Sequence, residues 1–185
     1  MKMVVVGLGY VGSANATILA QHCEVIGVDV SPSRVALLHA RKSPIGDQDL
    51  PDFLAAGDLN LSATTNLHVA LPGSDYVIIA TPTNYDEKLN FFDTRSVEDV
   101  AAECMQQVPE ACLVIKSTIP VGFVDGLRSK LQSQNIRRIA QVGRTYKRPD
   151  LAAYGHPRSA IDQAFFKNIS RNACGFFQRI RQLRD

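Results

Sequence analysis

The sequence predicts an α/β protein with a doubly wound, mostly parallel sheet and helices on both faces. Short apolar runs alternate with longer segments of helical character along residues 1–136. A Gly-x-Gly-x-x-Gly turn, Gly7–Gly12, joins the first apolar run to the first such segment. An acid, Asp29, closes the second apolar run 22 positions after Gly7. Together the three observations favour a strand–turn–helix–strand unit that opens a larger parallel sheet.

The first strand is expected over residues 1–6, because this run is short and apolar, as a buried parallel strand is. Gly7 lets the chain turn sharply, Gly9 lets a pyrophosphate approach the backbone, and Gly12 lets the following helix lie close to the strand. Amides at the N-terminus of that helix, expected over 13–23, would face the phosphates. Asp29 would accept hydrogen bonds from an adenosine ribose.

This unit predicts a dinucleotide site, and two alternatives stay open. One is a glycine-punctuated turn without a ligand. The other is an S-adenosylmethionine site of a methyltransferase, which also uses a glycine turn and an acid after the second strand. The third glycine, at this spacing, favours the dinucleotide.

The next elements follow from apolar periodicity and from helix start and stop signals. Ser31 and Pro32 begin a helix as its cap and first residue, and Thr65 or Asn66 caps a later one. Strands are expected at 25–28, 59–62, 75–80 and 111–116, and helices at 31–41, 47–56, 65–71, 96–107 and 120–132. A sixth strand at 137–142 stays open. Right-handed crossovers then produce a Rossmann-like sheet, with the loops after residues 6, 80 and 116 lining one site.

Hydroxyl side chains follow two of these strands. Thr81 and Thr83 come after one strand, and Ser117 and Thr118 come after another. A small hydroxyl at a strand end can bond a phosphate, a ribose or a catalytic water without filling the cleft. The alternative is a turn that satisfies its own backbone groups.

Composition narrows the class of protein. The 185 residues are 45% hydrophobic and 21% charged, which is typical of a globular protein with one core and at most a second small unit. No apolar run approaches the roughly 20 residues of a membrane span, and the glycines interrupt the only run that resembles a signal peptide. Four cysteines without Cys-x-x-Cys spacing argue against a disulfide framework or a metal site. The cytoplasm is the expected compartment.

Charge divides the chain into two parts. Residues 1–136 carry nine Lys and Arg against fifteen Asp and Glu, a net −6, whereas residues 137–185 carry eleven against three, a net +8. We therefore expect a Rossmann-like domain over 1–136 and a divergent, basic C-terminal tail over 137–185.

The motifs together resemble the UDP-glucose 6-dehydrogenase family, in its N-terminal NAD-binding domain. The resemblance rests on Gly-Leu-Gly-Tyr-Val-Gly at 7–12, Asp29, Ser-Pro-Ile at 43–45, Ala-Thr-Pro-Thr-Asn-Tyr-Asp at 80–86 and Ile-Lys-Ser-Thr-Ile-Pro-Val-Gly-Phe at 115–123. It implies a reaction in which the C6 hydroxyl of UDP-glucose is oxidised twice, with two NAD+, to give UDP-glucuronate.

The resemblance also implies site residues. It places the following residues around NAD: Gly7, Gly9, Tyr10, Val11, Gly12, Asp29, Arg34, Thr81, Thr83 and Thr118. Thr118 would lie beside the nicotinamide and organise the catalytic water, and no metal is implied. Asp29 independently favours NAD, since a carboxylate repels a 2′-phosphate. Arg34 would lie near the ribose, although an exposed helix arginine explains it equally well.

After residue 136 the chain departs from the family. The two glutamates of a family loop fall at Gln141 and Thr145. The family's dimer helix, its UDP-binding domain and the motif around its catalytic cysteine have no counterpart, and Cys174 lacks that motif. We expect this chain alone to bind NAD(H) weakly and to oxidise UDP-glucose little or not at all, and a homodimer is expected only of full-length relatives.

The tail has two interpretations. It is a truncated or frame-shifted end, or it is a genuine ending that binds something acidic. Aromatic residues interleave with Arg and Lys, but the basic residues form no helical stripe, so nucleic-acid binding is the less favoured interpretation. A non-catalytic dinucleotide-binding module with a basic interaction tail is the alternative to the enzyme.

Overall fold

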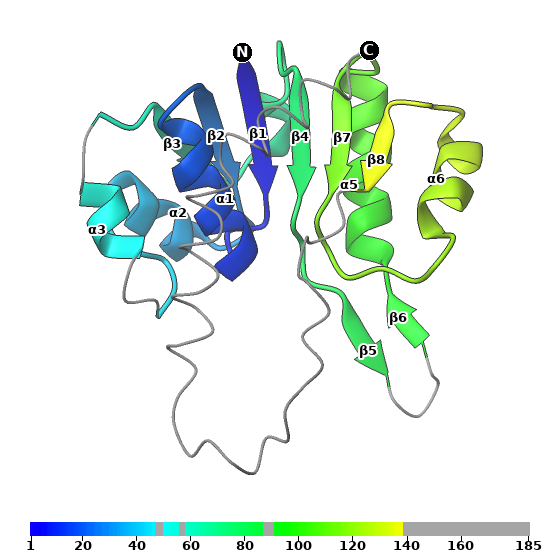
Figure 1. Cartoon of the computed structure of the whole chain (residues 1–185), viewed down its shortest axis with the longest axis horizontal. Coiled ribbons are helices and arrows are strands. Elements are labelled where there is room, and N and C mark those ends of the chain that lie inside the picture. The colour runs from blue at the N-terminus through cyan, green and yellow to red at the C-terminus, as the bar shows by residue number, and fades with distance from the viewer. Residues whose placement is uncertain (47–49, 56–57, 87–90, 139–185) are drawn as a thin grey trace.

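A six-stranded parallel sheet forms the centre of the molecule (Figure 1). The computed structural model describes residues 1–46, 50–55, 58–86 and 91–138. The strand order is β3-β2-β1-β4-β7-β8, and every neighbouring pair is parallel. The strands are β1 (Lys2–Val6), β2 (Glu24–Val28), β3 (Leu61–Thr64), β4 (Tyr76–Ile79), β7 (Cys112–Ile115) and β8 (Ile136–Arg138). The predicted doubly wound sheet is confirmed, and its strand order reverses between β1 and β4.

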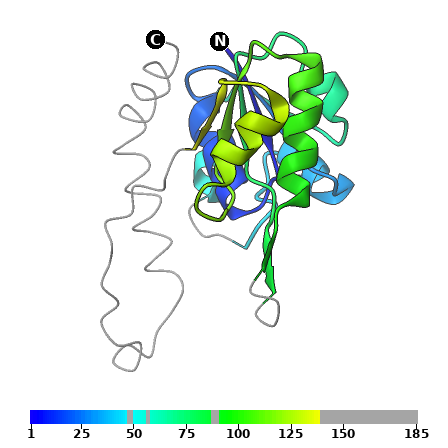
Figure 2. The ribbon, with the colours of Figure 1, turned by 90° about the vertical axis from the view of Figure 1, so that its right-hand side faces the viewer.

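Helices cover both faces of the sheet (Figure 2). Met3 and Val5 of β1 belong to one buried cluster, and Val4 and Val6 belong to the other. The first cluster includes α1 (Tyr10–Ala20), α2 (Pro32–His39) and α3 (Leu50–Ala55), whereas the second includes α4 (Leu67–Ala70), α5 (Arg95–Gln107) and α6 (Phe123–Leu131). Alternation along a strand buried on both sides produces these two cores.

Several boundaries differ from prediction. The first helix begins at Tyr10, within the glycine motif, so its first-turn amides come from residues 10–12. β3 begins at Leu61 rather than at residue 59. α6 begins at Phe123 rather than near residue 120, because Gly122, its N-cap, has a left-handed φ of 81°.

Two helix caps were predicted, and they behave differently. The Asn66 side chain accepts a hydrogen bond from the Val69 amide at 3.3 Å, as an N-cap does. Ser31 lies at the N-cap of α2, but its side chain makes no capping bond there and instead pairs with Ser33 at 2.8 Å. The Ser31 amide donates to Asp29 Oδ1 at 2.9 Å.

One element was not predicted from the sequence, an antiparallel hairpin of β5 (Asn84–Asp86) and β6 (Phe91–Asp93). It extends beyond the carboxyl edge of the sheet, below β4 and β7 in Figure 1. Each strand has only three residues, too few for an apolar alternation to identify, so the segment reads as a loop in the sequence.

The described part of the chain ends in β8. Ile136 is buried and pairs with Leu113 of β7. A sixth strand therefore forms, but it is short and begins at residue 136, one residue before the stretch where the sequence left it open. The predictions for residues 139–185, including those on Gln141, Thr145 and Cys174, lie outside the described residues. Within the described residues, no helix is long and apolar enough to cross a membrane.

Candidate functional site

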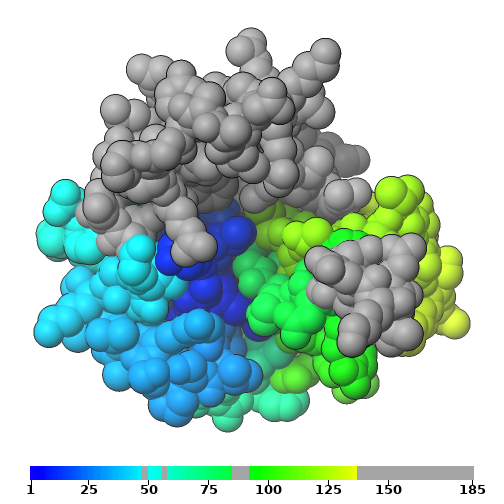
Figure 3. Space-filling view, turned by 90° about the horizontal axis from the view of Figure 1, so that it is seen from below, coloured from blue at the N-terminus to red at the C-terminus, as the bar shows by residue number. Residues whose placement is uncertain are grey.

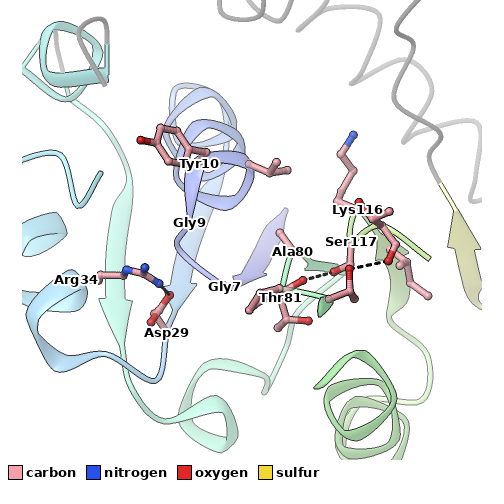
Figure 4. A pocket seen from close by; sticks show the side chains of 14 residues that line it. Gly7, Gly9, Tyr10, Asp29, Arg34, Ala80, Thr81, Lys116 and Ser117 are labelled. Atoms are coloured by element: carbon pink, nitrogen blue, oxygen red, sulfur yellow. Dashed lines mark hydrogen bonds and ion pairs between the residues drawn. The ribbon is translucent and has the colours of Figure 1, made fainter. Parts of the chain in front are cut away.

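A cavity of about 610 Å³ lies at the carboxyl edge of the sheet, where the strand order reverses (Figure 4). Figure 3 looks onto this edge, where the dark-blue surface of the N-terminal segment lies between the light-blue surface of the region around α2 and green surface from later elements. Nine of the ten predicted cofactor residues line the cavity: Gly7, Gly9, Tyr10, Val11, Asp29, Arg34, Thr81, Thr83 and Thr118. The tenth, Gly12, is buried against Gly7 and does not line the cavity.

The three glycines of the first loop occupy three different environments. Gly7 has a φ of +93°, and a Cβ there would lie 2.6 Å from the Ala80 carbonyl oxygen. A Cβ on Gly12 would lie 1.7 Å from the Gly7 carbonyl oxygen, so α1 packs against the loop more closely than any side chain permits. A Cβ on Gly9 would meet no protein atom within 4 Å. Gly7 and Gly12 shape the loop, and Gly9 leaves open space above the first turn of α1.

Asp29 holds this loop in place. Its side chain is 4% exposed. Oδ2 accepts a hydrogen bond from the Leu8 amide at 2.7 Å, and Oδ1 accepts one from the Ser31 amide at 2.9 Å. The carboxylate therefore joins the end of β2 to the glycine loop and to the start of α2, in addition to any contact it makes with a ribose.

Arg34 reaches the same carboxylate from α2. Its Nη1 lies 3.3 Å from Asp29 Oδ2, and its side chain is 46% exposed. The pair balances one negative charge with one positive charge at this end of the cavity (Figure 4). Arg34 thus lies beside Asp29 at one end of the cavity.

At the opposite end of the cavity from Asp29, hydroxyl groups join the loop after β4 to the loop after β7. Ser117 Oγ donates to the Thr81 carbonyl oxygen at 2.7 Å, and Thr83 Oγ1 donates to the Thr118 carbonyl oxygen at 2.7 Å. Ser96 of α5 adds a bond to Thr81 Oγ1 at 3.1 Å. Ser117 and Thr83 thus bond carbonyl groups of the opposite loop rather than the backbone of their own turn, which was the alternative expected for these hydroxyls.

Five residues of the cavity wall were not among the predicted cofactor residues, and two of them, Lys116 and Ser117, have polar side chains; the others are Ala80, Pro82 and Ile115. Lys116 follows the buried strand β7 directly, and burial lowers the pKa of its ammonium group. The sequence signal for Lys116 as a lining residue was its position between an apolar strand and a Ser-Thr pair. A lysine at the end of a strand is usually solvated, so this signal did not predict a lining residue.

The described cysteines lie elsewhere. Cys104 and Cys112 are buried in the two cores, and burial, with a smaller effect of Glu103, raises the pKa of the Cys104 thiol to about 12. Burial also raises the pKa of Cys23. None of these three cysteines lines the cavity, and the described residues contain no cluster of three or more His, Cys, Asp or Glu that could hold a metal ion.

Comparison with known proteins places this site in a family. Residues 1–147 match the profile of the UDP-glucose/GDP-mannose dehydrogenase family, NAD binding domain. The chain is 39% identical over 138 residues to the UDP-glucose 6-dehydrogenase of Campylobacter jejuni and 43% identical over 136 residues to that of Streptococcus pneumoniae. Each match covers 74% of this chain but 35% and 34% of the respective relative. The chain thus spans about a third of the length of the curated relatives that it matches.

Solved structures agree with the sequence comparison. A crystal structure of a ternary complex of GDP-mannose dehydrogenase from Pseudomonas aeruginosa superposes with a TM-score of 0.63 at 28% identity. It covers 75% of this chain and 35% of that one. The chain belongs to the UDP-glucose/GDP-mannose dehydrogenase family and contains that family's NAD-binding domain.

Proposed function

We propose that this chain is the NAD-binding part of a dehydrogenase that oxidises UDP-glucose to UDP-glucuronate. One observation carries the proposal: nine residues expected around NAD, from four separate segments, line one cavity at the point where the strand order reverses. This is where open α/β sheets bind their ligands. NAD+ itself supplies the acceptor for the hydride removed from the substrate.

Each side of the cavity has a proposed task. The first-turn amides of α1 lack intrahelical partners and bind the pyrophosphate, with Gly9 leaving the approach open. Asp29 binds the adenosine ribose while it holds the Leu8 amide, and Arg34 lies beside it. Thr83 and Thr118 lie at the nicotinamide end, where Thr83 fixes the Thr118 backbone and Thr118 organises the catalytic water.

The names of the relatives support UDP-glucose as the substrate. The two curated relatives at 39% and 43% identity are both UDP-glucose 6-dehydrogenases, whereas curated GDP-mannose 6-dehydrogenases are 29–33% identical. The three free cysteines of the described residues fit a reducing compartment, and we place the protein in the cytoplasm. A homodimer of full-length relatives stays a prediction.

Titration calorimetry of the 185-residue chain with NAD+ tests the cofactor site, with Gly9→Asp as the decisive variant. Position 9 has an ordinary φ of −77° and space for a side chain, and Asp is a favourable N-cap. The variant should fold normally yet place a carboxylate where the pyrophosphate approaches, so its affinity should fall roughly tenfold or more.

Gly126→Ala is the matched control, because a Cβ at that position of α6 meets nothing within 4 Å and α6 lies outside the cavity lining. It should bind NAD+ like the wild type. If Gly9→Asp retains full affinity, the dinucleotide does not lie over this loop and the proposal is wrong.

The second candidate is a dinucleotide-binding module without turnover. It is supported by the three described cysteines, none of which lines the cavity, since the second oxidation of this family needs a thiol nucleophile. UDP-glucose-dependent formation of NADH by the 185-residue chain tests the second candidate, and both candidates predict little or none. A robust steady-state rate would eliminate the second candidate.

A further inference from the structure

We propose that Lys116 determines how strongly the site prefers reduced over oxidised dinucleotide, with its ammonium group favouring NADH. The inference rests on the proposed function, because it assumes that the cavity holds NAD(H). It adds a specificity-determining residue to a position for which the sequence had indicated only the end of a strand.

The fold places Lys116 on the wall of the cavity. Its amide donates to the Ile79 carbonyl oxygen at 2.8 Å, so its backbone continues the pairing of β7 with β4. Ser117 and Thr118, which also line the cavity, follow it directly. Figure 4 shows Lys116 across the cavity from Asp29 and Arg34, at the end where the nicotinamide is proposed to lie.

Among the described residues that line the cavity, Lys116 differs from the other charged side chains in its pairing. Among the residues that the structure describes, the ionisable side chains that line the cavity are Tyr10, Asp29, Arg34 and Lys116. Asp29 and Arg34 pair with each other at 3.3 Å. Among the described lining residues, Lys116 is therefore the one charged side chain without an oppositely charged neighbour, and it is half-buried.

Burial increases the effect of this charge on a ligand. The desolvation that lowers the pKa of Lys116 also removes water that would screen the ammonium group. A cation there attracts the diphosphate of either form of the cofactor, but it repels the positive ring of NAD+ and not the neutral ring of NADH. For an ammonium group about 10 Å from the ring, with an effective dielectric constant of about 20, one unit of charge would change the affinity ratio roughly tenfold.

A lysine that only packs its aliphatic side chain over the cavity rim would not discriminate between NAD+ and NADH. Such a residue contributes equally to both forms of the cofactor, so its loss would weaken NAD+ and NADH by the same factor. The ratio of the two dissociation constants is therefore the quantity to measure, because general damage to the fold cancels in it.

The experiment compares wild type, Lys116→Met and Lys116→Arg in the 185-residue chain, with Lys116→Gln as a second neutral variant should the methionine variant unfold. Dissociation constants are measured by calorimetry for NAD+, NADH and ADP-ribose, which lacks the nicotinamide. We expect the neutral variants to lower the preference for NADH roughly tenfold, and Lys116→Arg to retain it.

Three other outcomes count against the inference, and they are distinguishable. If the neutral variants bind all three ligands more weakly by one common factor, Lys116 is only a diphosphate contact and the inference is wrong. If their affinities are those of the wild type, Lys116 does not act on the ligand at all. If wild type binds no dinucleotide, the proposed function fails together with the inference.

Discussion

Replacing Asp29 with alanine should destabilise the protein even when no dinucleotide is present. The carboxylate is almost fully buried and accepts hydrogen bonds from the Leu8 and Ser31 amides. Alanine removes both acceptors, and each buried amide left without a partner costs about 1–3 kcal/mol. The Leu8 amide is buried and the Ser31 amide is partly buried, so we expect a loss of about 3 kcal/mol.

Urea denaturation followed by far-UV circular dichroism measures this loss. With a slope of about 2 kcal/mol per molar urea, the midpoint should fall by roughly 1.5 M. The unfolding midpoint of Asp29→Asn should lie between those of wild type and Asp29→Ala, because its single carboxamide oxygen can accept from one amide. Arg34→Met removes only the half-exposed ion pair and should cost less than about 1 kcal/mol.

The reasoning is refuted if Asp29→Ala unfolds at the wild-type midpoint, or if Arg34→Met is equally destabilised. The first result would show that the carboxylate does not hold the loop, and the second that the ion pair holds it instead. If the expected loss is found, a weaker affinity of Asp29→Ala for NAD+ no longer demonstrates a ribose contact. Gly9→Asp then becomes the more informative binding variant.

Three further predictions concern packing, loop joining and pH. Gly12→Ala should lower the free energy of unfolding by about 3 kcal/mol in urea denaturation, because its Cβ would overlap the Gly7 carbonyl oxygen. Ser117→Ala loses its bond to the loop after β4 and should weaken binding of NAD+ about threefold to tenfold in calorimetry, with little change for ADP-ribose. Lys130 bonds Glu98 at 2.6 Å and lowers the pKa of that carboxyl. The stability that this pair contributes is present above about pH 4.3 and is lost as pH falls through the lowered pKa, so Lys130→Met should be slightly less stable than wild type at neutral pH and should approach it in acid.

Each of these predictions has a contrary outcome. Gly126→Ala, in open space on α6, should stabilise by about 0.5–1 kcal/mol, and a similar gain for Gly12→Ala would contradict the predicted overlap. An equal loss of NAD+ and ADP-ribose affinity in Ser117→Ala would mean that this bond supports the whole site. A difference for Lys130→Met that persists unchanged in acid would show that packing, not charge, is responsible.

Much of the fold could be predicted because its signals are local. The apolar runs of β1, β4 and β7, the glycine spacing and the stop signals each lie within a few residues, and the structure confirms the parallel sheet they predicted. The hairpin of β5 and β6 was missed because its strands are too short for a periodic pattern. The start of α6 was missed because it depends on the left-handed φ of Gly122.

In the candidate site too, some residues could be predicted from local spacing and others could not. Gly7, Gly12 and Asp29 belong to a single strand–turn–helix–strand unit, so their spacing alone indicated the loop that the structure contains. The bond from Thr83 to Thr118 joins residues 35 positions apart, and no local pattern indicates it. Lys116 reads as a solvated strand end until its neighbours are known.

By itself, then, the sequence determined the alternation of strands and helices, the close turn at the glycines and the acid that follows β2. These depend on backbone conformation and burial over short spans. Tertiary structure decided the contacts across the cavity: with β7 beside β4, Thr83 bonds the Thr118 backbone and Lys116 lies half-buried on the wall. The physical reason is that a side chain's charge and hydrogen bonds act over a few ångströms in space, whatever the number of residues between the partners.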